Sequence, residues 1–267
     1  MQGWSEFKAV ILKRTGIDLN AYKERQMLRR LTSLMASRGV EDFGSYLRLL
    51  SQDPKALREF MERLTINVSE FFRNPERFQE LRERFLPKLL KDASGAVGDR
   101  GVRQLRTWSA GCAAGEEAYS LAILLADTVP GQRLPVLATD LDADALKEAA
   151  IGRYPAARLK NVPPHLQKRY FEQDGDFFTV RPELRDRVRF RRHDLLRDPY
   201  EGDFDLILCR NVVIYFTEEA KDLLYKRFAA ALRPGGILFT GATEQIFQPQ
   251  RYGLQLVAPF FYQRSSL

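Results

Sequence analysis

Acidic side chains stand at two places where this chain could hold a ligand: the start of one predicted helix and the end of one predicted strand. Glu116 and Glu117 follow a loop of small residues that runs from Gly111 to Gly115, and Asp140 follows an apolar stretch typical of a buried strand. Small residues let the backbone approach a ligand closely, and an acid at the end of the second strand can accept both hydroxyls of a ribose. The spacing therefore indicates a site for a nucleoside-containing cofactor.

The loop sequence also narrows the choice of nucleoside. It reads Gly-Cys-Ala-Ala-Gly, which differs from the Gly-x-Gly-x-x-Gly of dinucleotide sites. Two carboxylates suit the positive end of a helix, but they would repel a pyrophosphate placed there. They suit a ligand that has a positive amino group and no phosphate, and S-adenosylmethionine is such a ligand. The alternative is an ordinary strand–turn–helix connection with a well-capped helix.

A second group of polar residues follows the buried strand predicted over 204–209. Arg210 and Asn211 come directly after it, and Tyr215 lies shortly beyond. Ligands of open α/β sheets bind at the carboxyl ends of the strands, so we expect these side chains beside the cofactor. Methyltransferases that act on amino groups of nucleic acids carry an Asp/Asn-Pro-Pro-aromatic motif here, and its prolines are absent. The alternative is a loop whose Asn and Tyr only satisfy backbone groups.

Length, hydropathy and cysteine content exclude several classes of protein. The 267 residues suffice for one large or two modest domains. No run of about eighteen uncharged apolar residues occurs, so no membrane insertion is expected, and the N-terminus lacks the segments of a secretory signal. Two cysteines, Cys112 and Cys209, and two distant histidines offer no metal-ligand spacing. We therefore expect a cytoplasmic protein with reduced thiols and no metal.

The positive charge of the chain is concentrated in its first third. Residues 1–91 hold 18 Lys and Arg against 12 Asp and Glu, whereas the remainder holds 24 against 23. The segment 22–38 has Met27 and Met35 on an apolar face, and we expect that face in the core. Its basic side chains would then meet an acidic partner surface, unless they form only a solvated face. The candidates for partner binding are Lys23, Arg25, Arg29 and Arg30.

The order of predicted elements indicates two domains of different class. Residues 1–91 read as helices, with starts at Asp53-Pro54 and Asn74-Pro75 where the side chain before proline would cap the helix. Residues 92–101 are glycine-rich and polar, which predicts a linker. From 102 to 267 strands and helices alternate, which predicts a mostly parallel sheet. A small antiparallel insertion is expected at about 155–190. The predicted strands lie near 104–109, 134–139, 187–192, 204–209, 236–241 and 256–263, and the predicted helices near 116–127, 142–151 and 217–232.

Five separated blocks together resemble one known family, the CheR family of chemotaxis receptor glutamate O-methyltransferases. The resemblance spans nearly the whole chain, with the blocks in the right order. The blocks are Asn-x-Ser-x-Phe-Phe-Arg at 67–73, Trp-Ser-Ala-Gly-Cys-Ala-Ala-Gly-Glu-Glu at 108–117, Ala-Thr-Asp-Leu-Asp at 138–142, Phe-Asp-Leu-Ile-Leu-Cys-Arg-Asn-Val-Val-Ile-Tyr-Phe at 204–216 and Leu-Arg-Pro-Gly-Gly at 232–236.

The resemblance implies an α/β fold: a class I, Rossmann-like methyltransferase domain with a small antiparallel β insertion, preceded by an all-helical N-terminal domain for receptor recognition. It also implies that the cofactor is S-adenosylmethionine, whose product is S-adenosylhomocysteine. It places Arg73 and Tyr215 near the transferred methyl as catalytic residues. With the loop glycine Gly111 added, the implied cofactor contacts are Asn67, Ser69, Arg73, Glu117, Asp140, Asp194, Leu195, Arg210 and Asn211.

The resemblance further implies the substrate and the partner. The chain would methylate glutamates in the cytoplasmic helical region of chemoreceptors during sensory adaptation, without binding nucleic acid and without entering the membrane. Some members grip a receptor C-terminal pentapeptide with a longer β-subdomain loop. The short Gln173-Asp-Gly-Asp176 turn predicts that such a tether is not used here.

Two other classes of function are alternatives. A nucleic-acid methyltransferase would suit the sequence pI of about 9.4, but the chain has no stripe of interleaved aromatic and basic residues. A cofactor-binding scaffold without catalysis is the other, and the presence of Arg73, Asp140 and Tyr215 disfavours it.

Overall fold

The chain folds into two compact units. The computed structural model describes residues 3–65, 69–95, 97–98, 101–102, 104–130 and 134–265. The first unit lies within Met1–Ile66 and Val212–Leu224, and the second within Asn67–Asn211 and Tyr225–Leu267. Neither boundary falls in the predicted linker 92–101. None of the helices in these described ranges is both long and apolar enough to cross a membrane.

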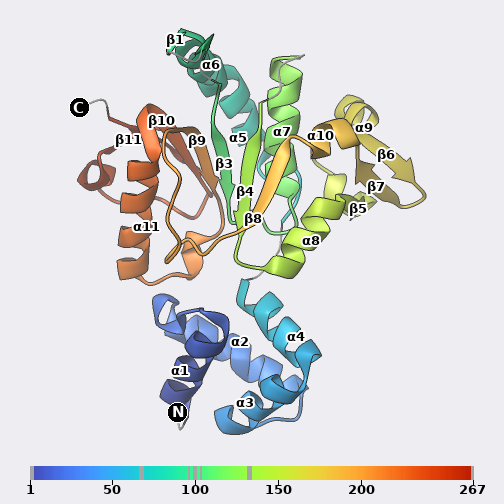
Figure 1. Ribbon diagram of the computed structural model, residues 1–267, viewed down its shortest axis with the longest axis vertical. Coiled ribbons are helices and arrows are strands. Elements are labelled where there is room, and N and C mark those ends of the chain that lie inside the picture. The colour runs from blue at the N-terminus through green and yellow to red at the C-terminus, as the bar shows by residue number, and fades with distance from the viewer. Residues whose placement is uncertain are drawn as a thin grey trace. The chain divides into compact units, whose positions relative to one another are not determined.

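The N-terminal part of the first unit is helical, as predicted (Figure 1). In the helix predicted over 22–38, the side chains of Met27 and Met35 are buried on one face, so their assignment to the core is confirmed. Asp53 precedes a proline start, and its carboxylate accepts a hydrogen bond from the N–H of Lys55 at 2.8 Å. The elements are α1 (Trp4–Thr15), the 3₁₀ turn η1 (Leu19–Ala21), α2 (Glu24–Ser37), α3 (Phe43–Gln52) and α4 (Pro54–Thr65).

The next helices belong to the second unit, which corrects the predicted domain boundary. They are α5 (Pro75–Glu80), the π-helical turn η2 (Leu81–Phe85) and α6 (Leu86–Gly95). Phe78, Phe85 and other apolar residues at helical spacing lie in the same hydrophobic cluster as α7 and the sheet. The rings of Phe85 and Phe261, for example, stack at 4.5 Å. This packing continues α6 to Gly95 inside the predicted linker, where β1 (Val97–Gly98) and β2 (Gly101–Val102) then pair.

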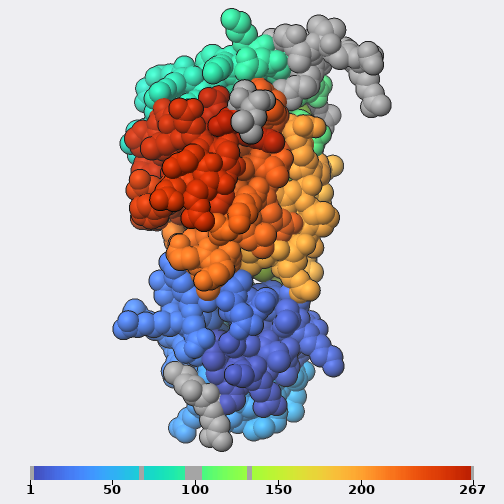
Figure 2. Space-filling view, turned by 90° about the vertical axis from the view of Figure 1, so that its left-hand side faces the viewer, coloured from blue at the N-terminus to red at the C-terminus, as the bar shows by residue number. Residues whose placement is uncertain are grey.

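The main sheet of the second unit is mostly parallel, as predicted. Among the described residues its strand order is β11-β12-β10-β9-β3-β4-β8, and only the pairings made by β12 are antiparallel. The single strand predicted over 256–263 is two strands, because Phe260 takes a φ of +73° and turns the chain between them. The last hairpin lies at the surface, in the red area of Figure 2. The strands are β3 (Thr107–Ala110), β4 (Val136–Asp140), β8 (Val188–Arg192), β9 (Phe204–Cys209), β10 (Leu232–Thr240), β11 (Leu254–Ala258) and β12 (Phe261–Arg264).

Helices cover both faces of this sheet. Alternate side chains of a strand point to opposite faces. Ser109 of β3 contacts α7 (Glu116–Thr128) through Glu117, whereas its neighbour Trp108 packs on Phe228 of α11 (Glu218–Ala231). The helix α8 (Ala143–Ile151) follows β4 (Figure 1). Because β3 runs parallel to both β4 and β9, the carboxyl ends of these strands lie at the same edge of the sheet. The predicted site residues follow these strand ends.

The predicted antiparallel insertion is confirmed. Its three strands are arranged in the order β5-β7-β6, with two short helices and a 3₁₀ turn beside them. The turn that joins β6 to β7 consists of Gly175 and Asp176 and is short, as expected from the sequence. The elements are β5 (Arg153–Pro155), η3 (Ala156–Leu159), α9 (Pro164–Tyr170), β6 (Phe171–Asp174), β7 (Phe177–Val180) and α10 (Pro182–Arg185).

Candidate functional site

The small-residue loop after β3 is held by β4 and α8. The N–H groups of Gly111 and Cys112 both donate to the carbonyl of Thr139, at 2.8 and 3.0 Å. At Gly115 φ is +95°, and a Cβ there would lie 2.8 Å from the Cβ of Ala149. Only glycine fits that conformation and that gap. The loop from Gly111 to Gly115 is thus a tightly held turn without large side chains.

Asp140 ends β4, as predicted, and its carboxylate closes the loop. Its two oxygens accept from the N–H groups of Ala113 at 2.8 Å and of Asp142 at 2.9 Å. The residue is only 9% exposed, and burial raises the pKa of its carboxyl although these backbone bonds oppose the change. Each carboxylate oxygen has a second lone pair. The N–H of Leu141 adds a third backbone hydrogen bond, and the four lone pairs of the carboxylate still leave it able to accept from a ligand such as a ribose.

Glu117 is a buried acid that meets a hydroxyl and, at longer range, a guanidinium. Its Oε1 accepts from the hydroxyl of Ser109 at 2.8 Å, and its Oε2 lies 3.9 Å from Nη1 of Arg210. Burial raises the pKa of this carboxyl to about 7, against the opposing effects of Arg210, Ser109 and Arg73. A carboxyl whose pKa is shifted this far by burial is typical of a functional site. A cation bound beside it would lower the pKa of this carboxyl and favour its ionised form.

Glu116 differs from its neighbour, although the sequence suggested a pair of equivalent acids. It is fully buried and forms an ion pair with Arg158, a residue of the insertion that sequence reasoning missed. The same guanidinium donates to the carbonyl of Ser69 at 2.6 Å. Burial raises the pKa of Glu116, while Arg158 and a hydrogen bond with Ser69 lower it. Glu116 therefore anchors the segment that carries Ser69.

Arg210 fixes the backbone of Arg73. Its Nη2 donates to the carbonyl of Arg73 and to Oδ1 of Asn74, both at 2.8 Å, and its guanidinium lies 4.5 Å from the ring centre of Phe239. Burial lowers the pKa of Arg210, and Glu117 opposes that change. The sequence predicted that Asn74 caps a helix. Instead it takes a φ of +60°, and its side chain accepts from Arg210.

Arg73 and Ser69 were expected in the helical domain, and both belong to the second unit. The physical reason is their neighbour Phe71, which is fully buried and packs edge-on against Tyr154 and Phe171 of the insertion. Arg73 lies close enough to lower the pKa values of both Glu117 and Arg210. The predicted contact Asn67 lies outside the described residues.

The ends of β9 and β10 are joined by Glu244, a second residue that the site prediction left out. Its Oε2 accepts from the N–H of Asn211 at 2.6 Å and from that of Gly241 at 2.8 Å. A Cβ on Gly241 would meet the same oxygen at 2.4 Å, so this approach needs glycine. Asn211 itself takes a φ of +61°. The sequence signal was an acid a few residues beyond the apolar strand predicted near 236–241.

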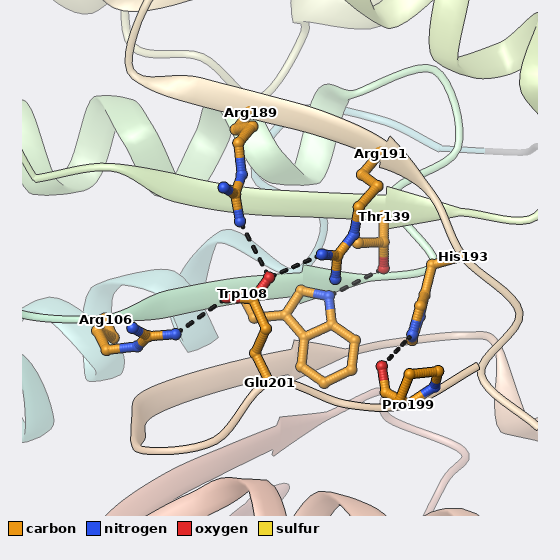
Figure 3. A network of polar contacts seen from close by, with 8 residues as sticks. All are labelled: Arg106, Trp108, Thr139, Arg189, Arg191, His193, Pro199 and Glu201. Carbon is orange, nitrogen blue, oxygen red and sulfur yellow. Dashed lines mark hydrogen bonds and ion pairs between the residues drawn. The ribbon is translucent and has the colours of Figure 1, made fainter.

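Asp194 and Leu195 follow β8 beside the end of β4. The N–H of His193 donates to the carbonyl of Asp140 at 2.9 Å, which brings Asp194 next to that acid. The carboxylate of Asp194 accepts from the N–H of Leu196 at 2.8 Å and so shapes the turn. Figure 3 shows how this segment is held, since the Glu201 carboxylate meets three guanidinium groups and His193 meets the Pro199 carbonyl. The three partners of Glu201 are Arg106, Arg189 and Arg191, at 3.0, 3.0 and 2.7 Å.

Nine of the predicted site residues belong to the second unit. They are Ser69, Arg73, Gly111, Glu117, Asp140, Asp194, Leu195, Arg210 and Asn211. In the part of the chain that is described, no group of three or more His, Cys, Asp and Glu side chains is arranged to hold a metal ion.

Tyr215 and the basic residues of α2 belong to the first unit. Tyr215 ends the 3₁₀ turn η4 (Val213–Tyr215), and the guanidinium of Arg30 lies 4.6 Å from its ring centre. Arg25 and Arg29 are exposed, as expected for partner binding. Lys23 is half-buried, and burial together with the charge of Lys221 lowers its pKa.

Comparison with known proteins covers almost the whole chain. The CheR methyltransferase SAM-binding domain matches residues 67–257, and the CheR methyltransferase all-alpha domain matches residues 2–65. A chemotaxis protein methyltransferase of Listeria innocua is 44% identical over 256 residues, covering 96% of this chain and 95% of the relative. Chemotaxis protein methyltransferase 1 of Pseudomonas aeruginosa is 34% identical over 265 residues, covering 95% and 94%. The Escherichia coli chemotaxis protein methyltransferase is 36% identical over 253 residues, covering 91% and 84%.

Proposed function

This chain belongs to the CheR methyltransferase family, and we propose that it transfers methyl groups to glutamate side chains of chemoreceptors, forming γ-methyl esters. The chain is an S-adenosylmethionine-dependent methyltransferase of chemotaxis, with a Rossmann-like domain that carries a small antiparallel sheet. The observation that carries the finer proposal is Arg73. Its backbone is held by Arg210, and its charge lies near Glu117. A guanidinium near the cofactor residues suits a carboxylate acceptor.

The residues of the second unit fit the cofactor. We propose that Asp140 accepts the ribose hydroxyls with its remaining lone pairs and that Glu117 balances the positive amino group. The raised pKa of Glu117 supports this, because burial disfavours the charged carboxylate even with Arg210 nearby, and a bound ammonium group would favour it. The bare loop from Gly111 to Gly115 allows close approach of a ligand to the backbone. Ser69, Asp194, Leu195 and Asn211 would complete the contacts, together with Asn67.

Methyl transfer to a carboxylate requires little of the protein except that it positions the two reactants. S-adenosylmethionine supplies an electrophilic methyl group whose sulfonium leaving group departs neutral. A glutamate carboxylate, with an ordinary pKa of about 4.3, is already an anion at neutral pH, so no side chain has to remove a proton. We propose that Arg73 holds the acceptor carboxylate and that Tyr215 orients the attacking oxygen. Positioning and exclusion of water then supply most of the rate.

One labelling assay tests this function. The protein is incubated with S-adenosylmethionine carrying a radiolabelled methyl group and with receptor membranes, with RNA, or with neither. We expect label on receptor protein that is released by mild base, because a carboxylate methyl ester hydrolyses in base. Label on RNA would favour a nucleic-acid methyltransferase, and cofactor binding without transfer would favour a non-catalytic scaffold.

We also propose that α2 docks on the cytoplasmic helical region of the receptor, within the cytoplasm and without a pentapeptide tether. Arg25 and Arg29 are exposed, and the glutamates to be methylated would give the receptor helices a complementary charge. Reversing both charges (Arg25→Glu with Arg29→Glu) is expected to raise the apparent KM for receptor by about tenfold. Methylation by the unaltered protein should also fall as salt rises, because exposed charges are screened over about 8–10 Å at 0.10–0.15 M.

A matched control changes the same number of charges elsewhere on the first unit. Lys55→Glu with Arg58→Glu alters two exposed residues of α4. This pair should leave the KM within about twofold, as surface substitutions away from a contact do. Equal effects of the two double variants would mean that net charge, and not α2, governs receptor binding.

The raised pKa of Glu117 predicts pH-dependent cofactor binding. Below a pH of about 7 the free carboxyl holds a proton, which a bound ammonium group would displace. The affinity for S-adenosylhomocysteine should therefore be about tenfold weaker at pH 5.5 than at pH 7, and binding at the lower pH should release about one proton. Calorimetry in buffers with different ionisation enthalpies measures both quantities.

Glu117→Gln provides the control for this prediction. The amide cannot titrate, so its affinity should be weaker and nearly constant over the same pH range. A Glu117→Gln variant that keeps the full pH dependence would assign the proton to another group of the site, such as Asp140, whose pKa is also raised by burial.

A further inference from the structure

Helix α2 and the turn that carries Tyr215 are joined by backbone hydrogen bonds within the first unit. The N–H of Lys23 donates to the carbonyl of Tyr215 at 2.9 Å, and the N–H of Thr217 donates to that of Ala21 at 2.8 Å. Between these bonds Tyr22 and Phe216 form an antiparallel bridge, and their rings lie 4.9 Å apart. The start of α2 and η4 are therefore one rigid piece, although about 190 residues separate them in the chain.

Arg30 adds a side-chain contact about two turns further along, on α2. Its guanidinium lies over the ring of Tyr215, 4.6 Å from the ring centre. Arg30 is half-buried, whereas its neighbour Arg29 is exposed. Beside the pair is a hollow of about 420 Å³, lined by Gln26, Arg29, Arg30, Ile214 and Tyr215. No acid is among these lining residues, and two of them are arginines, so the stacked guanidinium faces a positively charged hollow.

We propose that Arg30 is a positioning residue for methyl transfer, which holds the ring of Tyr215 in place from the helix that docks the receptor. The inference rests on the proposed function, in which Tyr215 orients the acceptor oxygen. A tyrosine side chain has two rotatable bonds, and a ring covered on one face by a planar cation loses part of that freedom before the substrate arrives. Receptor docking on α2 and orientation of the phenol are then mechanically coupled.

The choice of arginine separates this role from simple charge attraction. A guanidinium is planar and stacks on an aromatic face, whereas an ammonium group on a flexible stem does not reproduce that geometry. Lysine at position 30 would keep the charge offered to an acidic receptor but lose the stack. Arg29 offers the matched comparison, because it lines the same hollow and does not cover the ring.

The test compares Arg30→Lys and Arg30→Ala with Arg29→Lys and Arg29→Ala in the full-length protein, with receptor as substrate. Both Arg30 variants should lower kcat by about tenfold, with a smaller change in KM. Arg29→Ala should raise the KM for receptor, and Arg29→Lys should have a KM close to that of the unaltered protein. In a Tyr215→Phe background, Arg30→Lys should cause little further loss of kcat, because the hydroxyl that it positions is gone.

A measurement that does not depend on turnover completes the test. In protein labelled with fluorotyrosine, the fluorine NMR signal that Tyr215→Phe removes belongs to Tyr215. Arg30→Lys should shift and broaden that signal if the stack holds the ring, and Arg29→Lys should leave it in place. Thermal unfolding of each variant checks that the first unit stays folded.

Either of two results would overturn the inference: Arg30→Lys with the kcat and fluorine signal of the unaltered protein, or Arg30 variants that change only KM. The second result would make Arg30 a docking residue. Failure of the proposed function looks different, because the unaltered protein would then place no base-labile methyl group on receptors.

Discussion

Arg73→Ala is expected to lower kcat for receptor methylation by about a hundredfold or more, while the Kd for S-adenosylhomocysteine changes by less than about fivefold. The reason is that we assign Arg73 to the acceptor carboxylate, so its contribution is made in the transition state. Its backbone carbonyl is held by Arg210, and its charge lowers the pKa of Glu117, so the guanidinium lies near the residues that we assign to the cofactor. Initial rates with receptor and calorimetry with the product measure the two constants.

Arg77→Ala is the matched control for this prediction. Arg77 is a half-buried arginine of the next helix, ion-paired with Glu80 at 2.8 Å, and it has no assigned role in the site. Its loss should leave kcat within about twofold. If Arg73→Ala weakened product binding as much as it slowed turnover, Arg73 would be a cofactor ligand only.

Tyr215→Phe belongs to the same prediction, because it removes only the hydroxyl that would orient the acceptor oxygen. We expect kcat to fall by about tenfold or more with cofactor affinity unchanged. Tyr252→Phe makes the same chemical change at a half-buried position without an assigned role. Unchanged turnover in Tyr215→Phe would remove this hydroxyl from the mechanism.

Asp140→Ala is expected to weaken binding of both S-adenosylmethionine and S-adenosylhomocysteine by about ten- to a hundredfold, since a hydrogen bond to a charged group contributes about 1.5–3 kcal/mol. The carboxylate is buried at the end of β4, and it has more lone pairs than the backbone N–H groups around it use. Calorimetry with each ligand measures the effect.

Two further variants separate ribose binding from loop structure. Alanine leaves the N–H groups of Ala113 and Asp142 without their carboxylate, so thermal unfolding must be measured as well. Asp140→Asn keeps a carbonyl oxygen for one of them, but it loses the charge and replaces the other acceptor oxygen by a donating NH2 group. Asp144→Ala, which changes a half-buried acid paired with Lys147 in the next helix, should bind both ligands normally. Full affinity in Asp140→Ala would contradict the ribose assignment.

The sequence by itself determined most of the secondary structure and the acids of the site. Met27 and Met35 lie on a buried helical face because the spacing of apolar residues is a local property that packing preserves. The Gly111–Gly115 loop and the acid at the end of β4 follow from the same kind of local pattern. The cofactor assigned from these residues agrees with the family. The assignment was possible because the small residues and the strand-end acid lie within one strand–loop–helix–strand connection, so their spacing can be read from the sequence.

Only the tertiary structure decided which of these residues act together. Glu116 and Glu117 are adjacent carboxylates at the start of one helix, but their side chains point in different directions. Glu116 pairs with Arg158, whereas Glu117 accepts a hydrogen bond from Ser109. Asn74 accepts from Arg210 instead of capping a helix, since burial of that guanidinium requires acceptors.

The same holds for the division of the chain. Phe71 and the apolar residues up to Ala93 join the core of the second unit, while the segment 212–224 joins the first unit through the bonds between η4 and α2. Local patterns set where helices and strands form. The partners of Tyr215, Arg73 and Glu244 depend on contacts between residues far apart in the chain, which only the folded packing creates.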